Sequence, residues 1–284
     1  MNAFPSLFTI HSSLKMFRLR FWFLLLIALL CWLGVKFYGE WSAEQLECNR
    51  IQLPQEALRG AGPLRIAFFS DLHNNPQLFE KAIEHIAAAK PDLILFGGDL
   101  VTAEERFRRT KWAVNGFRKL RSIAPTYAIL GNHDYEKQEQ VERVLATAGI
   151  SLLRNQAIDW TTPTGSTLRI IGLGDWNEAD ESPASCMRPA GQEPHPVLLL
   201  SHDPESRWHL RRYDWDLMLS GHTHGGQIGN PFTGQCISFR SSTPAGLFDF
   251  ESQRRIIVTR GVGAIFNMRF FCPPEVNIIE VNNE

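Results

Sequence analysis

The sequence has few of the features that mark well-known protein classes. Its five cysteines include no Cys-x-x-Cys pair, so neither a thiolate zinc site nor a dithiol redox motif is expected. The formal net charge of −1 provides no overall field to attract nucleic acid, although a local basic patch would not show in this total. There is no internal repeat and no low-complexity stretch. We therefore expect no specific nucleic-acid partner, and spacing alone does not predict a disulfide.

One long apolar run lies near the start of the chain. Phe21–Val35 carries no charged residue and follows Lys15, Arg18 and Arg20. As a helix rising about 1.5 Å per residue, this run spans about 22 Å, and a short continuation makes a crossing of the ~30 Å hydrocarbon core feasible. We therefore predict a transmembrane signal anchor at 21–38.

The charges around this run predict its orientation. The basic segment 1–20 favours a cytoplasmic N-terminus, with the bulk of the chain outside the cytoplasm. Lys36 and Arg50 weaken this asymmetry, so a domain on the cytoplasmic face stays open. A cleaved signal peptide is the alternative to an anchor, because its apolar core is typically this short. No convincing Ala-x-Ala cleavage signal follows the run, and a start at Met16 instead of Met1 also stays open.

The rest of the chain predicts one α/β domain at 63–284, joined to the anchor by a linker at 39–62 that contains prolines and glycines. The first half alternates short apolar runs with helical spacing, which favours an α/β layered fold. Strands are expected at 64–69, 92–96 and 126–130, and helices at 76–89, 104–121 and 136–148. After Gly149 the pattern predicts a second sheet packed on the first, with helices outside. Its strands are expected at 167–173, 197–201, 215–220, 255–259 and 276–281, with a helix near 204–212.

Five clusters of polar residues follow directly on predicted strands, where open α/β sheets place ligands. They are Ser70-Asp71-Leu72-His73, Gly97-Gly98-Asp99, Gly131-Asn132-His133-Asp134, Ser201-His202-Asp203 and Gly221-His222-Thr223-His224-Gly225-Gly226. Taken singly, most have an ordinary explanation as a turn, a helix cap or a hydrogen-bonded core histidine. Together they hold five of the nine histidines and supply oxygen and imidazole donors without thiolate. That donor set suits divalent manganese, iron, cobalt or zinc.

In their order these clusters resemble the scattered signature of the calcineurin-like metallophosphoesterases, D-x-H … G-D … G-N-H-[DE] … H … G-H-x-H. No member is missing between Asp71 and His224. The longer forms SDLH, GGD, GNHD and GHTHGGQ, with Thr259–Gly263, resemble a narrower bacterial branch of membrane-associated YaeI- and YkuE-type phosphodiesterases. The resemblance implies a four-layer α/β-β/α sandwich and two divalent metal ions, with manganese favoured over iron, zinc or cobalt. Leu100, which follows Asp99, is not the tyrosine that purple acid phosphatases would have nearby.

The resemblance also implies a role for each residue of the site. The first metal would be held by Asp71, His73 and His224. The second would be held by Asn132, His202 and His222, with Asp99 bridging both. His133 would be a catalytic group at the leaving-group oxygen rather than a ligand. Asp134 would orient His133, although a helix-capping role explains it equally well.

The expected function is metal-dependent hydrolysis of a phosphoester or pyrophosphate by a hydroxide activated between two metals. An anchored enzyme suggests a membrane-associated or lipid-linked substrate, at the bacterial inner membrane with the domain in the periplasm. A UDP-2,3-diacylglucosamine-type pyrophosphatase is an alternative that needs a cytoplasmic-facing site.

Two further alternatives are weaker. The near-neutral charge disfavours a nuclease or cyclic-nucleotide phosphodiesterase, although Arg207, Arg211 and Arg212 could bind a polyanion. A non-catalytic binding module is least favoured, because every signature residue is present. No protein partner can be inferred.

Overall fold

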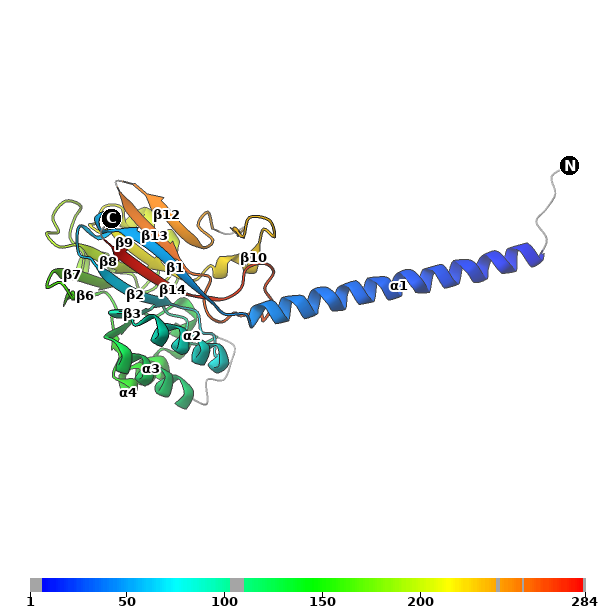
Figure 1. The fold of residues 1–284 in the computed structure, drawn as a ribbon, viewed down its shortest axis with the longest axis horizontal. Coiled ribbons are helices and arrows are strands. Elements are labelled where there is room, and N and C mark those ends of the chain that lie inside the picture. The colour runs from blue at the N-terminus through cyan, green and yellow to red at the C-terminus, as the bar shows by residue number, and fades with distance from the viewer. Residues whose placement is uncertain (1–6, 103–109, 239–240, 252, 283–284) are drawn as a thin grey trace.

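A long N-terminal helix projects from two packed sheets in the computed structural model (Figure 1). The structure describes residues 7–102, 110–238, 241–251 and 253–282. Within the helix α1 (Leu7–Ala43), the segment Met16–Ala43 is long and apolar enough to cross a membrane, and none of its most apolar stretch is buried. A signal sequence passes the same test of length and composition. From Met16 onward, the buried residues of α1 are Gly39, Ser42 and Ala43, and Gly39 lies against the side chains of Met268 and Phe270.

The first sheet contains the strands predicted in the first half of the chain. Its order is β1 (Glu47–Pro54), β14 (Glu275–Asn282), β2 (Leu64–Phe69), β3 (Leu93–Phe96), β4 (Thr126–Ala128) and β5 (Ser151–Leu152). The strands β2 to β5 are parallel, because a helical segment follows each of the first three and returns the chain to the same end. The helices of this sheet are α2 (Pro76–Ala89), α3 (Lys111–Ile123) and α4 (Gln138–Ala148). Strand β14 pairs antiparallel with β2, so the sheet is mixed.

The second sheet is also mixed. Its order is β12 (Gly246–Phe250), β13 (Arg254–Val258), β9 (Leu217–Ser220), β8 (Val197–Leu200), β7 (Thr167–Gly172) and β6 (Gln156–Thr161). The four central strands are parallel, and each edge strand forms an antiparallel pair with its neighbour. A small hairpin of β10 (Ile228–Gly229) and β11 (Cys236–Ile237) lies beside the end of α1 (Figure 1).

Apolar side chains hold the layers together. Between the helices and the first sheet, Phe79 packs against Phe69 and Phe117 with ring centroids 5.9 and 5.2 Å apart. A second core lies between the sheets and includes Phe68 and Leu198. These strands are buried on both faces, which explains why their sequences are continuous apolar runs rather than alternating ones.

The fold agrees with the predicted α/β architecture of two packed sheets, and the expected strands and helices of the first half are present. Residues 104–109 of one predicted helix lie outside the described residues. One prediction is wrong: the strand at 276–281 belongs to the first sheet, where β14 lies between β1 and β2. Its apolar run predicts a buried strand but does not identify the neighbours. Residues 47–54, within the predicted linker, form the edge strand β1, and the predicted domain limits remain predictions.

The helical cover of the two sheets is unequal. Three helices cover the first sheet, whereas the short helix α5 (Arg207–Leu210) and irregular segments cover the outer face of the second. The structure is therefore an α/β fold of two mixed sheets, in which the outer layer on the first sheet is helical and the outer layer on the second is mostly irregular.

Candidate metal centre

The five polar clusters meet at one end of the two sheets. Parallel strands end at the same edge, so the residues after β2, β3 and β4 lie next to one another, as do those after β8 and β9. The two groups face each other across the interface between the sheets. The short helices η2 (Asn132–Lys137) and η5 (His224–Gln227) carry parts of two clusters.

Backbone strain is concentrated in these loops. Five residues of the predicted site have a positive φ between 43° and 67°, a region that costs a non-glycine residue about 1–3 kcal/mol and is concentrated at functional sites. They are Asp71, His73, Asp99, His222 and His224. Hydrogen bonds between the loops maintain this conformation, for example from Asp71 N to Gly98 O at 2.8 Å and from His73 N to Asp99 O at 3.2 Å.

Two glycines allow the loops to approach closely. A Cβ at Gly131 would overlap the Asp99 carboxylate and lie 2.6 Å from the His202 ring. A Cβ at Gly221 would overlap the Asp71 carboxylate. The glycines before Asn132 and His222 are therefore required by packing at the site itself.

Two buried groups of side chains could each hold a cation. In the first, His224 Nε2 lies 3.0 Å from His73 Nε2 and 3.4 Å from Asp71 Oδ1. In the second, His202 Nε2 lies 3.2 Å from Asp99 Oδ2 and 4.0 Å from Asp71 Oδ1. Asp71 is common to both groups, so the two possible cation positions are adjacent.

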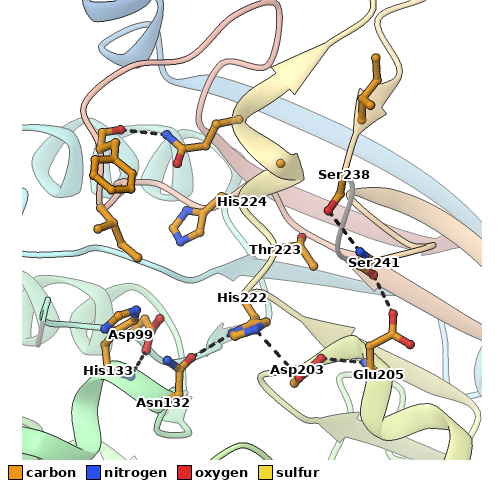
Figure 2. Close-up of a pocket in the computed structure, with 15 residues that line it drawn as sticks. Asp99, Asn132, His133, Asp203, Glu205, His222, Thr223, His224, Ser238 and Ser241 are labelled. Atoms are coloured by element: carbon orange, nitrogen blue, oxygen red, sulfur yellow. Dashed lines mark hydrogen bonds and ion pairs between the residues drawn. The ribbon is translucent and has the colours of Figure 1, made fainter.

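His222 and Asn132 complete the ring of donors. His222 Nδ1 lies 2.9 Å from Asn132 Oδ1, and its Nε2 lies 3.9 Å from Asp203 Oδ2 (Figure 2). All seven predicted ligands are thus at one place.

The donor chemistry fits divalent cations. His202 Nδ1 lies 2.7 Å from Gly97 O, which fixes the proton there and leaves Nε2 free to coordinate. Among the described residues, this buried Nε2 has no hydrogen-bond partner. The Nε2 atoms of His73 and His224 face each other at 3.0 Å, and a shared cation would satisfy both as neutral ligands.

Burial and neighbouring side chains shift the pKa values of Asp99 and His224. Burial opposes ionisation of Asp99, but the nearby His202 and His73 rings keep the pKa of this carboxyl below its usual value. Burial lowers the pKa of His224 to about 3, so this ring is neutral at physiological pH. Neutral imidazole is the form that binds a metal.

His133 and Asp134 have different surroundings. The His133 N–H donates to Asp99 Oδ1 at 2.9 Å, and its ring lies in the cavity wall (Figure 2). The ring is edge-on to that of His73. The Asp134 carboxylate is fully buried and accepts four backbone N–H groups, from Asp99, Leu100, Val101 and Gly131. It joins the loop after β3 to the loop after β4.

Several residues that support the site were not predicted as part of it. Thr102 Oγ1 lies 3.3 Å from His73 Nδ1, and Asn177 Nδ2 donates to Asp203 Oδ2 at 3.0 Å. Asp203 directly follows His202, so its place in the cluster Ser201-His202-Asp203 could have identified it as a supporting residue of the site. Arg207, one of three arginines considered as binding a polyanion, is not available for that role. Its side chain is buried and donates to Pro204 O and Thr243 Oγ1.

A cavity of about 520 Å³ opens beside the two groups. Its lining includes the polar side chains of Asp99, His133 and His222 (Figure 2) and also the apolar side chains of Ile265 and Phe266. A ligand in this cavity can therefore contact the cation-binding groups and an apolar surface at once.

Comparison with known families assigns the site. The profile described as calcineurin-like phosphoesterase matches residues 64–226, which is more than half of the chain. The chain belongs to the calcineurin-like phosphoesterases. The phosphodiesterase YaeI of Escherichia coli (strain K12) is 37% identical over 232 residues, 78% of this chain and 83% of the relative. With both buried groups in place, this phosphoesterase is a dinuclear metal-dependent enzyme.

Two other relatives cover most of the chain. The uncharacterized metallophosphoesterase YkuE of Bacillus subtilis (strain 168) is 28% identical, over 86% of this chain and 90% of its own length. The UDP-2,3-diacylglucosamine pyrophosphatase LpxG of Chlamydia trachomatis is 27% identical, over 75% of this chain and 82% of its own length. The phosphoesterase described here is similar to both.

Proposed function

We propose that this phosphoesterase is a phosphodiesterase that hydrolyses phosphoester or pyrophosphate bonds in amphiphilic, membrane-associated substrates. One observation carries the proposal: a single cavity is lined both by cation-binding groups and by the apolar side chains of Ile237, Ile265 and Phe266, which we call its apolar wall. A substrate with a phosphate next to an acyl or prenyl chain matches both parts of this lining. The name of the YaeI relative supports phosphodiester hydrolysis.

The proposed ligand roles are those that the family resemblance implies. Asp71, His73 and His224 would hold one cation, and the proximity of their donor atoms, within 4.8 Å of one another, supports this group. Asn132, His202 and His222 would hold the second, with Asp99 shared by both; Asp99 lies in one buried group with His202 and Asp71. When bound, two divalent ions lower the pKa of water and neutralise charge on the phosphate.

His133 acts on the leaving group. Its ring lines the cavity from the same loop as Asn132, and its backbone N–H donates to Asp99 Oδ1, so its position next to Asp99 is fixed. A protonated ring donates to the leaving oxygen, and such acid catalysis contributes about 10²–10⁴-fold. Asp134 is a positioning residue, because its carboxylate binds backbone N–H groups of the loops that carry Asp99 and His133.

The location of α1 supports a substrate at the membrane surface. The chain that forms the apolar wall continues from Phe266 to Phe270 and Phe271, whose rings lie 6.1 and 5.3 Å from that of Tyr38 near the end of α1. Arg269 N also donates to Gly39 O at 2.9 Å. If α1 is an anchor, the cavity wall lies close to the bilayer surface, at the inner membrane and on the periplasmic side.

A pyrophosphatase acting on a UDP-linked diacylglucosamine is the second candidate. The name of the LpxG relative indicates such a substrate for that protein, and the substrate combines a pyrophosphate with acyl chains. The acyl chains of such a substrate could contact the same apolar side chains of the cavity. This candidate needs a cytoplasmic-facing site, which a reporter fused to the C-terminus would reveal.

The proposed activity is tested with full-length protein in detergent, loaded separately with manganese, iron, zinc or cobalt. We expect hydrolysis of bis-p-nitrophenyl phosphate, with manganese giving the highest rate. Parallel assays with a phospholipid, a lipid-linked pyrophosphate and nucleotide diesters identify the substrate class. Preference for soluble nucleotide diesters over both lipids would contradict the proposal.

A further inference from the structure

A pair of cysteines lies directly beneath the loop that carries His224. Cys236, in β11, and Cys272, just before β14, are 36 positions apart in the sequence, yet their Sγ atoms are 3.1 Å apart. Cys272 is fully buried and Cys236 is half-buried. A bond of about 2.05 Å between these sulfurs requires an approach of only about 1 Å. We propose that Cys236 and Cys272 form a disulfide that fixes the loop of the metal centre.

The Cys272 sulfur contacts the backbone of that loop, and the Cys236 sulfur lies close to Gly225. The Cys272 Sγ lies 3.7 Å from His224 O and from Gly225 O. A Cβ on Gly225 would lie 2.7 Å from the Cys272 Sγ and 2.9 Å from the Cys236 Sγ. Gly225 has φ of +64°, so the loop turns sharply over the two sulfurs. A covalent bond there would limit the movement of the backbone that sets the position of His224.

A buried arginine, Arg269, also holds the backbone next to His224 and Cys272 by hydrogen bonds. The side chain of Arg269 is fully buried, and its Nη1 donates to His224 O and to Cys272 O, both at 3.2 Å. Its Nη2 donates to Gly263 O at 2.7 Å. Arg269 therefore ties the loop to the chain around Cys272, and the disulfide would add the hairpin β10–β11 to the same support.

The bond forms by thiol–disulfide exchange with a small-molecule or protein disulfide as oxidant. The half-buried Cys236 thiolate attacks one sulfur of the oxidant, which releases one thiol and leaves a mixed disulfide on Cys236. The Cys272 thiolate then displaces the second thiol and completes the Cys236–Cys272 bond. The oxidant takes up two electrons, and the two protons from the cysteines end on its thiols. An oxidising compartment outside the cytoplasm provides such conditions.

The test is a map of free thiols in the full-length protein. Protein purified in detergent without reductant, before and after incubation with oxidised glutathione, is denatured, alkylated with N-ethylmaleimide and digested. We expect three alkylated cysteines and one cross-linked peptide pair that contains Cys236 and Cys272, released only by reductant. The cross-link should be lost in Cys236→Ser and retained in the control Cys186→Ser. Full alkylation of both cysteines after the glutathione step, or a glutathione adduct on Cys236 alone, would overturn the proposal.

A second measurement tests the effect on the metal centre. Mass spectrometry of metal content during challenge with a chelator gives the rate of metal loss without reference to activity. We expect the reduced protein and Cys236→Ser to lose one of two metal equivalents at least ~10-fold faster, in the range seen when outer contacts of metal ligands are removed. Equal rates for the oxidised and reduced forms would show that the bond does not fix the loop.

Discussion

The carboxylate of Asp134 accepts the backbone N–H of Asp99 at 2.9 Å, and this contact joins two of the loops that build the metal centre. The same carboxylate accepts three more backbone N–H groups, so it provides the hydrogen-bond acceptor for four backbone donors of these loops. The Asp134 side chain is fully buried and is not among the residues that line the cavity, so its contacts act on the position of Asp99.

Replacing Asp134 with asparagine should weaken both the fold and the site. The amide has one acceptor oxygen and an NH₂ group that would face N–H donors, which leaves buried groups unsatisfied at a cost of about 1–3 kcal/mol. We expect a fall of several degrees in Tm and a loss of metal during gel filtration. Unchanged Tm and metal content would mean that the four hydrogen bonds are dispensable.

His133→Ala should separate catalysis from metal binding. The His133 ring lies in the cavity wall outside both buried ligand groups, so we expect two metal equivalents to remain and kcat to fall by at least ~10². Metal analysis and bis-p-nitrophenyl phosphate kinetics on the same sample give both numbers. A variant that has lost a metal would show that His133 is a ligand.

Metal removal should destabilise the protein. Asp71 and Asp99 are buried carboxylates within one cluster, and bound cations stabilise the folded state by about 2.7 kcal/mol at a hundredfold excess over Kd. We expect a chelator to lower Tm by about 5–10 °C and added manganese to restore it. Asp99→Asn, which removes one buried charge of the cluster, should abolish hydrolysis and show a smaller change with manganese. A wild-type Tm that does not respond to the chelator would contradict a buried dinuclear site.

Glu181 should make stability depend on pH. Burial raises the pKa of Glu181 to about 7, and its carboxyl lies 2.6 Å from His209 Nε2. Because the folded state holds this proton more tightly than the unfolded chain, the stabilising contribution is full below about pH 4.5 and is lost as pH rises through 7. The Tm of the wild type minus that of Glu181→Gln should therefore fall between pH 4.5 and 7.5. A difference that stays constant would place the pKa elsewhere.

The sequence predicts the site better than the fold around it. Each ligand follows an apolar strand and carries its chemistry in its side chain, so Asp71, Asp99 and His202 are visible in the sequence. The roles of Asp134 and Arg207 depend on backbone atoms far along the chain, and composition does not reveal such partners. The neighbours of β14 could not be predicted for a similar reason, because an apolar run that is buried on both faces fits either sheet.

The apolar wall of the cavity should affect lipid substrates selectively. Ile265 is 42% exposed, lines the cavity and belongs to neither buried cation-binding group, so Ile265→Asp places a charge where we propose that an acyl chain lies. We expect a loss of at least ~10-fold in kcat/KM for a bilayer-embedded phosphodiester and a much smaller loss for bis-p-nitrophenyl phosphate. Leu247→Asp, at a similarly exposed residue in β12, is the matched control and should change neither rate. Equal losses on both substrates would show that Ile265 does not contact the lipid.

The most direct test compares one reaction in two settings. Full-length enzyme in nanodiscs is assayed with a p-nitrophenyl phosphodiester that carries long acyl chains and with the same phosphodiester headgroup lacking them. A cavity lined by both cation-binding groups and apolar side chains predicts a kcat/KM at least ~10-fold higher for the acylated substrate. Equal values, or a preference for the soluble form, would contradict a phosphodiesterase that acts on membrane lipids.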